Sequence, residues 1–328
     1  MKKLKFLTLG LLFFLLFISA CTKEEEAKIN EAQVLVEYLE SANSPLGKDF
    51  VNTDMPTLMA ASEVKTLNET NQVYIIDIRA VADFTAGHIK NAKNVAVADL
   101  LTHIKSVDLA SYTKVAIVCY TGQTAAWAGS LLRLMGYSKV FSMKWGMCSW
   151  NTTFASKWNN SIGNAYAAQF TSTAANKAAK GELPVLSTGK TTGKEILEAR
   201  VNALLAEGFT PASVTNATVF GNLTSYYIVN YWPVNHYTTP GHIPGAIQYT
   251  PKESIKFSAD ITTLPTNKTI VVYCYTGQTS AYLAAYLRLL GYDAKSLLYG
   301  TNGMIYDLMG TNSLTQFKAS EIMGYTYE

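Results

Sequence analysis

Cysteine is scarce in this sequence, with four residues in a chain of 328. Cys21 lies near the N-terminus, and Cys119, Cys148 and Cys274 are widely separated. An exported protein with a disulfide framework more often has an even and denser set, so we expect free thiols. The sequence also lacks any Cys-x-x-Cys pair, and its four histidines are scattered, which is not the ligand spacing of a metal site. We therefore predict no metal ion and no cofactor.

Long apolar runs are absent too. A membrane-spanning helix needs roughly 20 apolar residues, and residues 6–18 fall short of that length. This run follows Lys2, Lys3 and Lys5, a pattern typical of an export signal. Small residues then lead to Cys21, and the arrangement resembles the lipobox of bacterial lipoproteins, which implies lipidation of Cys21. An ordinary cleaved signal and an uncleaved anchor helix are the alternatives.

An excess of one charge is missing once this signal is removed. The whole chain has 27 basic and 24 acidic residues, and loss of the three lysines of the signal leaves 24 of each. A neutral chain without a basic stripe offers no electrostatic footprint for DNA or RNA, so we exclude nucleic-acid partners. Residues 22–26 form a charged run that we interpret as a solvated tether, with a surface-export signal as the alternative. The expected location is the cell envelope, with a lipid anchor in the outer membrane on its periplasmic or surface side.

One long segment occurs twice. Residues 117–137 read IVCYTGQTAAWAGSLLRLMGY, and residues 272–292 read VYCYTGQTSAYLAAYLRLLGY. Shorter matches precede both segments in the same order, including a Gly-His-Ile turn at residues 87–89 and 241–243. A repeat of this kind, in a chain long enough for two cores, predicts two domains with the same fold.

Each copy alternates short apolar strands with helices. Helices are expected over 124–135 and 279–290, where Gly136 and Gly291 are placed for left-handed caps. The expected strands cover 73–78, 93–97, 114–118 and 139–143 in the first copy and 226–231, 246–249, 269–273 and 295–299 in the second. This alternation predicts an α/β fold in which each domain is a small parallel sheet with helices on both faces.

These patterns divide the chain into five segments. Residues 151–192 are rich in small polar residues without clear periodicity, which favours a linker. Helices over 27–39 and 194–206 lead into the two copies. The predicted segments are a lipoprotein signal (1–21), a tether with a leading helix (22–64), the first domain (65–150), the linker (151–192) and the second domain with its leading helix (193–328).

A cysteine lies between a strand and a helix in both copies. Backbone N–H groups of such a loop and the following helix N-terminus attract anions, and Gly122 and Gly277 permit the tight backbone. We expect a depressed thiol pKa and predict Cys119 and Cys274 as nucleophiles, with inert buried cysteines as the alternative. The predicted substrate-binding loops are Tyr120, Thr121, Gly122, Gln123 and Thr124, and Tyr275, Thr276, Gly277, Gln278 and Thr279.

Together these motifs are similar to those of the rhodanese superfamily. The similarity covers about 65–150 and 215–307 and includes Ile-Ile-Asp77-Ile-Arg79, the Gly-His-Ile turns, both cysteine loops and the run from Trp145 to Trp150. It implies a tandem sulfurtransferase whose loop cysteine takes sulfur as a persulfide. The implied donor is thiosulfate, mercaptopyruvate or polysulfide, and the implied acceptor is a thiol or a cyanide-like molecule. The superfamily's phosphatases carry arginine six residues after the cysteine, where this chain has Ala125 and Ser280, so phosphatase activity is not expected.

The chain also departs from the family pattern. Familiar tandem sulfurtransferases keep the cysteine only in their C-terminal half, and their loops often carry a basic residue; here both halves keep it and both loops are uncharged. Thiosulfate is therefore expected to be a poor donor. In the second copy, Asp77, Arg79 and Asp83 are replaced by Asn230, Trp232 and His236. Our hypothesis is a structural ion pair between Arg79 and Asp83, since both partners change together.

Several residues have competing interpretations. We expect His88 and His242 to be structural rather than catalytic bases. Cys148 is expected to pack beneath the sheet edge, with a role as resolving thiol for Cys119 as the alternative. Arg133 and Arg288 are expected to be solvated or helix-end charges. The competing functions for the whole chain are a binding module without turnover and a thiol or persulfide sensor.

Overall fold

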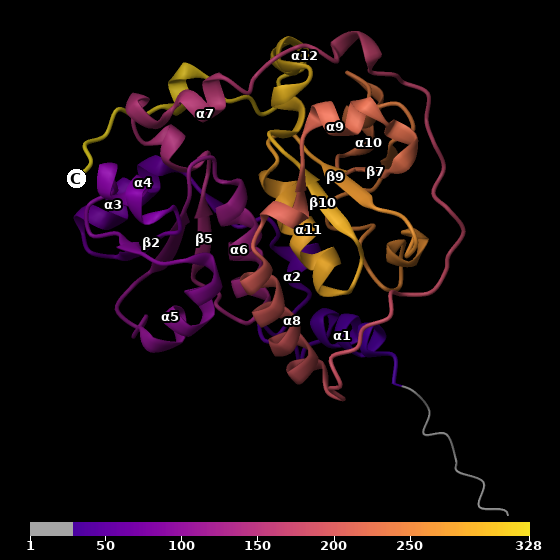
Figure 1. Cartoon of the computed structure of the whole chain (residues 1–328), viewed down its shortest axis with the longest axis horizontal. Helices are drawn as coiled ribbons and strands as arrows, with labels where there is room; N and C mark the ends of the chain where they lie inside the picture. The colour runs from indigo at the N-terminus through magenta and orange to yellow at the C-terminus, as the bar shows by residue number, and fades with distance from the viewer. Residues whose placement is uncertain (1–28) are drawn as a thin grey trace, which may run out of the picture.

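The structure is a computed structural model that describes residues 29–328. The predicted signal, Cys21 and the charged run 22–26 lie outside these residues. Figure 1 shows two halves, one coloured indigo to magenta and the other orange to yellow, each built around its own sheet.

The first sheet has five parallel strands in the order β1-β5-β4-β2-β3. Its central strand β4 carries the apolar run Val115 to Val118, which is buried on both faces, as expected for a parallel sheet covered by helices. The strands are β1 (Leu58–Met59), β2 (Val73–Asp77), β3 (Lys93–Asn94), β4 (Lys114–Val118) and β5 (Val140–Met143).

The second sheet repeats this topology, with the order β6-β10-β9-β7-β8 and parallel pairing throughout. Its strands are β6 (Ser213–Val214), β7 (Tyr227–Asn230), β8 (Ile247–Gln248), β9 (Ile270–Tyr273) and β10 (Ala294–Leu297). The prediction of two parallel α/β units is confirmed. The sequence pattern missed β1 and β6, because a strand of two residues is too short to show a period.

Helices cover both sheets, and the two long helices after the cysteine loops are bounded by glycines. Gly122 and Gly277 precede them with φ of 81° and 77°, and Gly136 and Gly291 follow with φ of 97° and 99°, so the predicted left-handed caps are confirmed. The helices are α1 (Glu31–Glu40), α2 (Phe50–Thr53), α3 (Ala61–Glu69), α4 (Val81–Ala86), α5 (Leu100–Ser106), α6 (Gln123–Leu134), α7 (Ser156–Asn159), α8 (Gly193–Glu207), α9 (Asn216–Gly221), α10 (Val234–Thr238), α11 (Gln278–Leu289) and α12 (Tyr306–Thr311). Within residues 29–328, none of these helices combines the length and the apolar character that a bilayer crossing requires.

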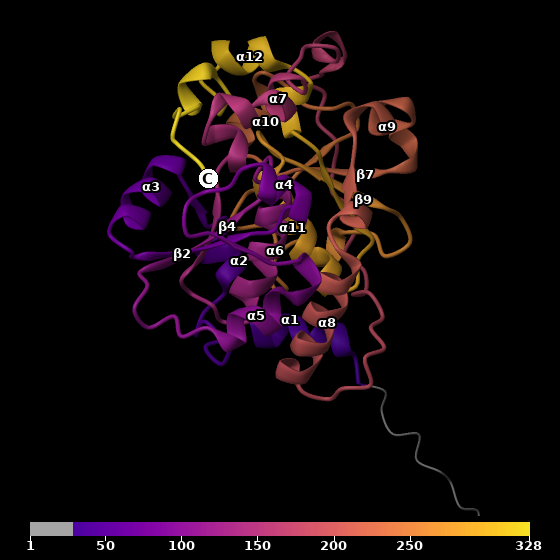
Figure 2. The ribbon, with the colours of Figure 1, turned by 60° about the vertical axis from the view of Figure 1, so that its left-hand side comes forward.

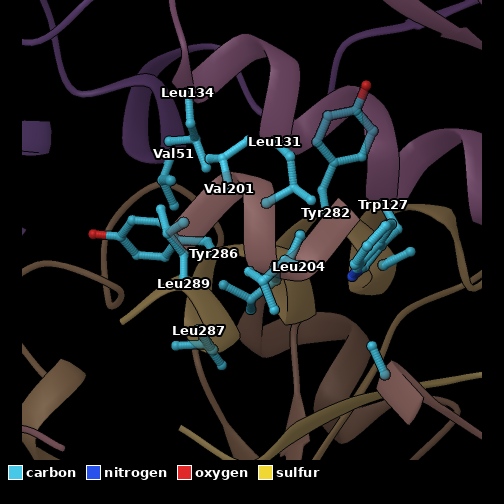
Figure 3. Close-up of a cluster of buried hydrophobic side chains, with 14 of the residues drawn as sticks. Val51, Trp127, Leu131, Leu134, Val201, Leu204, Tyr282, Tyr286, Leu287 and Leu289 are labelled. Carbon is cyan, nitrogen blue, oxygen red and sulfur yellow. The ribbon is translucent and has the colours of Figure 1, made fainter. Parts of the chain in front are cut away.

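The two repeats share one hydrophobic core across their junction. Helix α6 packs against α11, and α8 lies against both of them. Figure 3 shows Trp127 of α6, Tyr282 of α11 and Leu204 of α8 in this cluster. Full burial of one such side chain stabilises a fold by about 1.5–3 kcal/mol, so the apolar side chains of this junction stabilise the contact between the repeats.

The segment that trails each repeat packs on the other repeat. After the first repeat, Thr171 exchanges two backbone hydrogen bonds of 2.9 Å with His242 in the second. After the second repeat, Glu328 exchanges two backbone hydrogen bonds of 2.7 and 2.9 Å with His88 in the first. In Figure 1 the yellow C-terminal tail reaches the indigo half, and Figure 2 places α7 and α12 at one end of the molecule and α1 and α8 at the other. The trailing segments therefore cross.

The predicted linker, residues 151–192, joins the two domains and packs against them. Trp158 is fully buried, and Leu183 and Leu186 are buried in the shared core. Sequence periodicity could not show this, because the segment is anchored by single side chains rather than by an amphipathic face.

Candidate functional site

Cys119 lies at the end of β4, directly before α6, in a cradle of backbone N–H groups. Its Sγ accepts hydrogen bonds from the N–H of Gly122 at 3.2 Å and of Ala125 at 3.3 Å. Gly146 closes the cradle from the neighbouring strand connection, where an added Cβ would lie 2.3 Å from the Cys119 carbonyl oxygen. The loop therefore has the predicted geometry for holding negative charge on sulfur.

The expected depression of the thiol pKa is wrong for Cys119. Burial raises the pKa of this thiol, because only 5% of the residue is exposed and a thiolate loses its hydration there. The N–H groups of Ala125, Thr121 and Gly122 oppose this effect, and the nearby charge of Asp77 adds to it. The resting site thus holds a protonated thiol at neutral pH.

Cys274 occupies the same place after β9 but has different partners. The N–H of Ser280 donates to its Sγ at 3.3 Å, and the thiol lies 3.5 Å from the Ser280 hydroxyl. That hydroxyl is in turn 2.8 Å from the hydroxyl of Ser296. Only 2% of Cys274 is exposed. A buried hydroxyl network therefore surrounds the second thiol, where Ala125 offers the first thiol no side-chain partner.

A cleft of about 460 Å³ opens above Cys119 between the two repeats. Thr121 and Thr124 of the first loop line it, and Cys274 does not. The second repeat contributes Phe209, Thr210, Ser213, Leu298 and Tyr299 to its wall. The site at Cys119 is therefore assembled from both repeats.

Arg79 pairs with Asp77 and not with Asp83, so the hypothesis of an Arg79–Asp83 ion pair is wrong. The Arg79 guanidinium donates to Asp77 at 2.6 and 3.0 Å and to the carbonyl of Gly87 at 2.7 Å, and both charged side chains are 1% exposed. Asp77 lies at the end of β2, two residues before Arg79, and the turn folds the guanidinium back onto its carboxylate. In the second repeat Asn230 replaces this acid and donates to the hydroxyl of Tyr273 at 2.8 Å.

Asp83 instead accepts a hydrogen bond of 2.9 Å from the hydroxyl of Tyr120. Its counterpart His236 contacts the hydroxyl of Tyr275 through Nδ1. Tyr275 also stacks on Trp232, with ring centres 4.9 Å apart and planes 14° apart. A side chain of α4 thus contacts the hydroxyl of Tyr120, and one of α10 contacts the hydroxyl of Tyr275. The ring of Tyr275 stacks on Trp232, whereas the ring of Tyr120 lies 5.1 Å from the Arg79 guanidinium.

Lys157 is a cleft residue that the sequence did not reveal. Its Nζ lies 3.9 Å from the centre of the Tyr120 ring, and its side chain lines the cleft. It belongs to α7, in the segment predicted as a linker. Nothing local marked it or Phe209, because both reach Cys119 only through tertiary packing.

The two glutamines of the loops cross the junction. Gln123 accepts a hydrogen bond of 2.7 Å from the N–H of Tyr299 in the second repeat, and Gln278 accepts one of 3.4 Å from the N–H of Trp145 in the first. Gln278 is fully buried, so its predicted substrate-binding role is corrected to an interdomain contact. Gln123 lines the cleft, but its carbonyl oxygen is already engaged.

The other predicted loop residues also differ between the repeats: Tyr120, Thr121 and Thr124 of the first loop line the cleft, and no residue of the second loop does. Thr276 and Gly277 are buried and Thr279 is half-buried, and none of them lines the cleft at Cys119.

His88 contacts the carbonyl of Phe84 through Nδ1, and His242 contacts those of Tyr237 and Thr173. Neither histidine lines the cleft, and the backbone of each holds a trailing segment.

Cys148 is fully buried, and its thiol donates to the carbonyl of Phe154 at 3.0 Å. Burial raises the pKa of Cys148 to about 12, which leaves little thiolate for a resolving role. Arg133 and Arg288 both lie in the last turn of their helices, as expected for helix-end charges, but Arg133 is not solvated, since it is 5% exposed and lies 3.3 Å from Asp54. Arg288 pairs with Glu207. Across residues 29–328, no three His, Cys, Asp or Glu side chains are grouped in a way that could hold a metal ion.

The family of rhodanese-like domains matches residues 60–153 and 225–304, which together are more than half of the chain. This chain belongs to that family. Its two rhodanese-like domains each contain one of the cysteine loops. The matched ranges also include β2, β4, β5 and their counterparts in the second domain.

Relatives match single domains or the tandem. The thiosulfate sulfurtransferase GlpE of Pseudomonas fluorescens (strain Pf0-1) is 35% identical over 95 residues, which cover 29% of this chain and 84% of the relative. The solved structure of SseA from Escherichia coli, titled as a 3-mercaptopyruvate sulfotransferase, is 16% identical with a TM-score of 0.27 and covers 75% of this chain and 98% of that one. A thiosulfate sulfurtransferase structure from Pseudomonas aeruginosa is 17% identical with a TM-score of 0.30 and covers 82% of this chain and 46% of that one.

Proposed function

We propose that this chain is a sulfurtransferase that carries sulfane sulfur as a persulfide on Cys119. The observation that carries the proposal is the position of Cys119 at a cleft lined by both domains, beneath a cradle of N–H donors. Membership of the rhodanese-like family and the similarity to a thiosulfate sulfurtransferase support sulfur transfer in general.

The cradle suits each step of this chemistry. The Cys119 thiolate attacks the outer sulfur of a donor, the bond from that sulfur to the donor breaks, and the donor leaves with the electron pair. The new S–S bond places a terminal sulfur in the cleft, and a nucleophilic acceptor then takes that sulfur and regenerates the thiolate. Backbone N–H groups stabilise the negative charge on sulfur at both stages, because their positions are fixed before the reaction.

Cys274 is proposed to take no part in turnover. It lies outside the cleft, with its thiol inside the Ser280 and Ser296 network and its neighbour Tyr275 stacked on Trp232. The sequence alone suggested two independent nucleophiles, and the proposal now assigns the reaction to the first.

Intact-mass measurement tests this assignment. Wild type, Cys119→Ser, Cys274→Ser and the control Cys148→Ser are each incubated with thiosulfate, mercaptopyruvate or polysulfide and then with cyanide. We expect one added sulfur, removed by cyanide, in every protein except Cys119→Ser. Sulfur retained in Cys119→Ser would move the reaction to another thiol. No adduct from any donor on a folded protein with titratable thiols would favour a binding module.

We further propose that the chain is exported and anchored by lipid at Cys21. The supporting observation is the basic and apolar N-terminal sequence that ends in Ser19-Ala20-Cys21. Incorporation of labelled palmitate by wild type, and its absence in Cys21→Ala, is the expected result. Equal labelling of both proteins would contradict the anchor.

A further inference from the structure

The charges at the cleft are balanced. Among the described residues, the charged side chains that line it are Arg79, Asp83 and Lys157. Arg79 is already paired with Asp77 inside the domain, so its charge is largely compensated. One cation and one anion therefore remain to face a ligand.

These two charges lie near one another without forming an ion pair. Asp83 accepts from the hydroxyl of Tyr120, and Lys157 lies 3.9 Å from the centre of the same ring. Among residues 29–328 neither Lys157 nor Asp83 takes part in an ion pair, so each retains capacity for a further partner.

The remaining wall is apolar and belongs to the second domain. Phe209, Leu298 and Tyr299 face the first domain across the cleft. The volume of about 460 Å³ lies within the range of small organic ligand sites, roughly 300–1,000 Å³. A small inorganic dianion would leave this wall uncovered, and repulsion by Asp83 would offset its attraction to Lys157.

On the basis of the proposed sulfurtransferase function, we propose that the preferred donor is the persulfide of an amino acid or short peptide, bound as a zwitterion. Lys157 contacts its carboxylate, Asp83 contacts its ammonium group, and the aromatic wall covers its carbon chain. Asp83 and Lys157 are thus specificity residues that position the donor over Cys119.

Atoms and electrons balance in the transfer without an added oxidant. The Cys119 sulfur attacks the outer sulfur of the persulfide, and the donor S–S bond breaks as the new S–S bond forms on Cys119. The amino-acid thiolate leaves with the electron pair and takes up the proton that the Cys119 thiol gives up. One persulfide and one thiol react to give one thiol and one persulfide.

Donor competition with charge-neutralised variants tests this assignment. Loading of Cys119 is followed by rapid quenching and intact mass with cysteine persulfide, mercaptopyruvate and thiosulfate. Asp83→Asn retains an acceptor for Tyr120 and is expected to slow loading from cysteine persulfide by about two- to fivefold, as for the loss of one partly solvated charge contact. The same variant should leave mercaptopyruvate unchanged and should not slow thiosulfate, since neither has an ammonium group.

Lys157→Gln is expected to slow cysteine persulfide and mercaptopyruvate by a similar factor, because both carry a carboxylate. Lys180→Gln and Asp307→Asn remove exposed charges away from the cleft and serve as matched controls. Equal slowing of all three donors by Asp83→Asn, or fastest loading from thiosulfate, would overturn the zwitterion assignment and leave the sulfurtransferase intact. Failure of every donor to load wild-type Cys119 would instead contradict the proposed function.

Discussion

Cys119 and Cys274 lie in loops of identical sequence, yet their surroundings differ. The first loop faces a cleft with Lys157 and Asp83 at its mouth, whereas the second lies beneath Trp232 and beside Ser280. Loop identity therefore does not imply that both thiols do the same chemistry. What decides access to each cysteine is the set of side chains that the other segments bring to it.

The junction between the domains gives a second reason for the loops to be identical. An added Cβ on Gly122 would lie 2.2 Å from Nε2 of Gln278, and one on Gly277 would lie 2.3 Å from Oε1 of Gln123. Each Gly-Gln pair thus packs against the other. Because each Gly-Gln pair packs against the other, the junction needs both pairs whether or not both cysteines react.

Among the tests of how the two domains differ, Arg79→Ala is expected to change the free energy of unfolding most. This change leaves Asp77 buried without its partner, and loss of one member of a buried pair costs about 3–5 kcal/mol. Urea unfolding of the full chain measures the loss. The double variant Asp77→Asn with Arg79→Trp copies the second domain and should recover part of this stability. An unchanged unfolding midpoint in Arg79→Ala would show that the pair contributes nothing to the fold.

A smaller effect is expected at the junction. Gln123→Ala leaves the half-buried N–H of Tyr299 without an acceptor and Gln278→Ala leaves the buried N–H of Trp145 without one, and such a loss costs about 1–3 kcal/mol at a buried site. The bond of Gln123 is 2.7 Å and that of Gln278 is 3.4 Å, so Gln123→Ala should cost more. Unfolding midpoints give the ranking, with exposed Gln72→Ala as control. Equal and negligible changes would mean that the apolar helices alone hold the domains together.

Thiol reactivity should separate the two sites through pH. Burial raises the pKa of Cys119, so the thiol is protonated at pH 7 and its alkylation by iodoacetamide should keep accelerating as pH rises above 9. Cys274 should be alkylated more slowly than Cys119, because it lies outside the cleft and is 2% exposed. Peptide mapping after timed labelling measures both rates. A rate for Cys119 that levels off below pH 7 would show a depressed pKa after all.

The smallest expected effect is a difference in pH dependence between a glutamate on leading helix α1 and one on leading helix α8. Burial raises the pKa of Glu40 to about 7, against the hydrogen bond from the N–H of Phe257. Its stabilising contribution is therefore complete below the ordinary value of 4.5 and is lost as pH rises towards 7. Glu198 on α8 has the opposite sign, since its hydrogen bond with Lys105 lowers its pKa and its contribution is lost as pH falls.

Glu40→Gln should accordingly increase stability at pH 8 relative to pH 5, by less than about 1 kcal/mol because the carboxyl is partly solvated. Urea midpoints at the two pH values provide the measurement, and Glu198→Gln is the matched control with the opposite trend. A Glu40→Gln effect that is the same at both pH values would contradict the raised pKa.

The sequence predicted those parts of the fold that depend on local pattern. Strands such as β2 and β4, with five apolar or mostly apolar residues, and the helices after the cysteine loops were predicted to within about two residues at each end. The strands β1 and β6 were missed because two residues are too few to show a periodic pattern.

The sequence predicted the site residues that are contiguous in the chain and missed those that tertiary packing brings to the cleft. Cys119 and its loop follow from the strand, glycine and helix order, whereas Lys157 reaches the same cleft from α7 by tertiary packing. The joint change at positions 79 and 83 predicted a structural ion pair of Arg79, but with the wrong acid. It could not tell which acid Arg79 contacts, because both acids change in the second copy.

The crossing of the trailing segments also bears on how the protein is made. Trp145 and Trp150 of the first domain donate their indole N–H groups to Glu321 and to the carbonyl of Thr326, residues near the very end of the chain. Domains generally fold in the order in which they emerge, but these contacts join the first domain to residues that follow the second. The packing of Trp145 and Trp150 can therefore be completed only after residues 321–326 have reached the first domain.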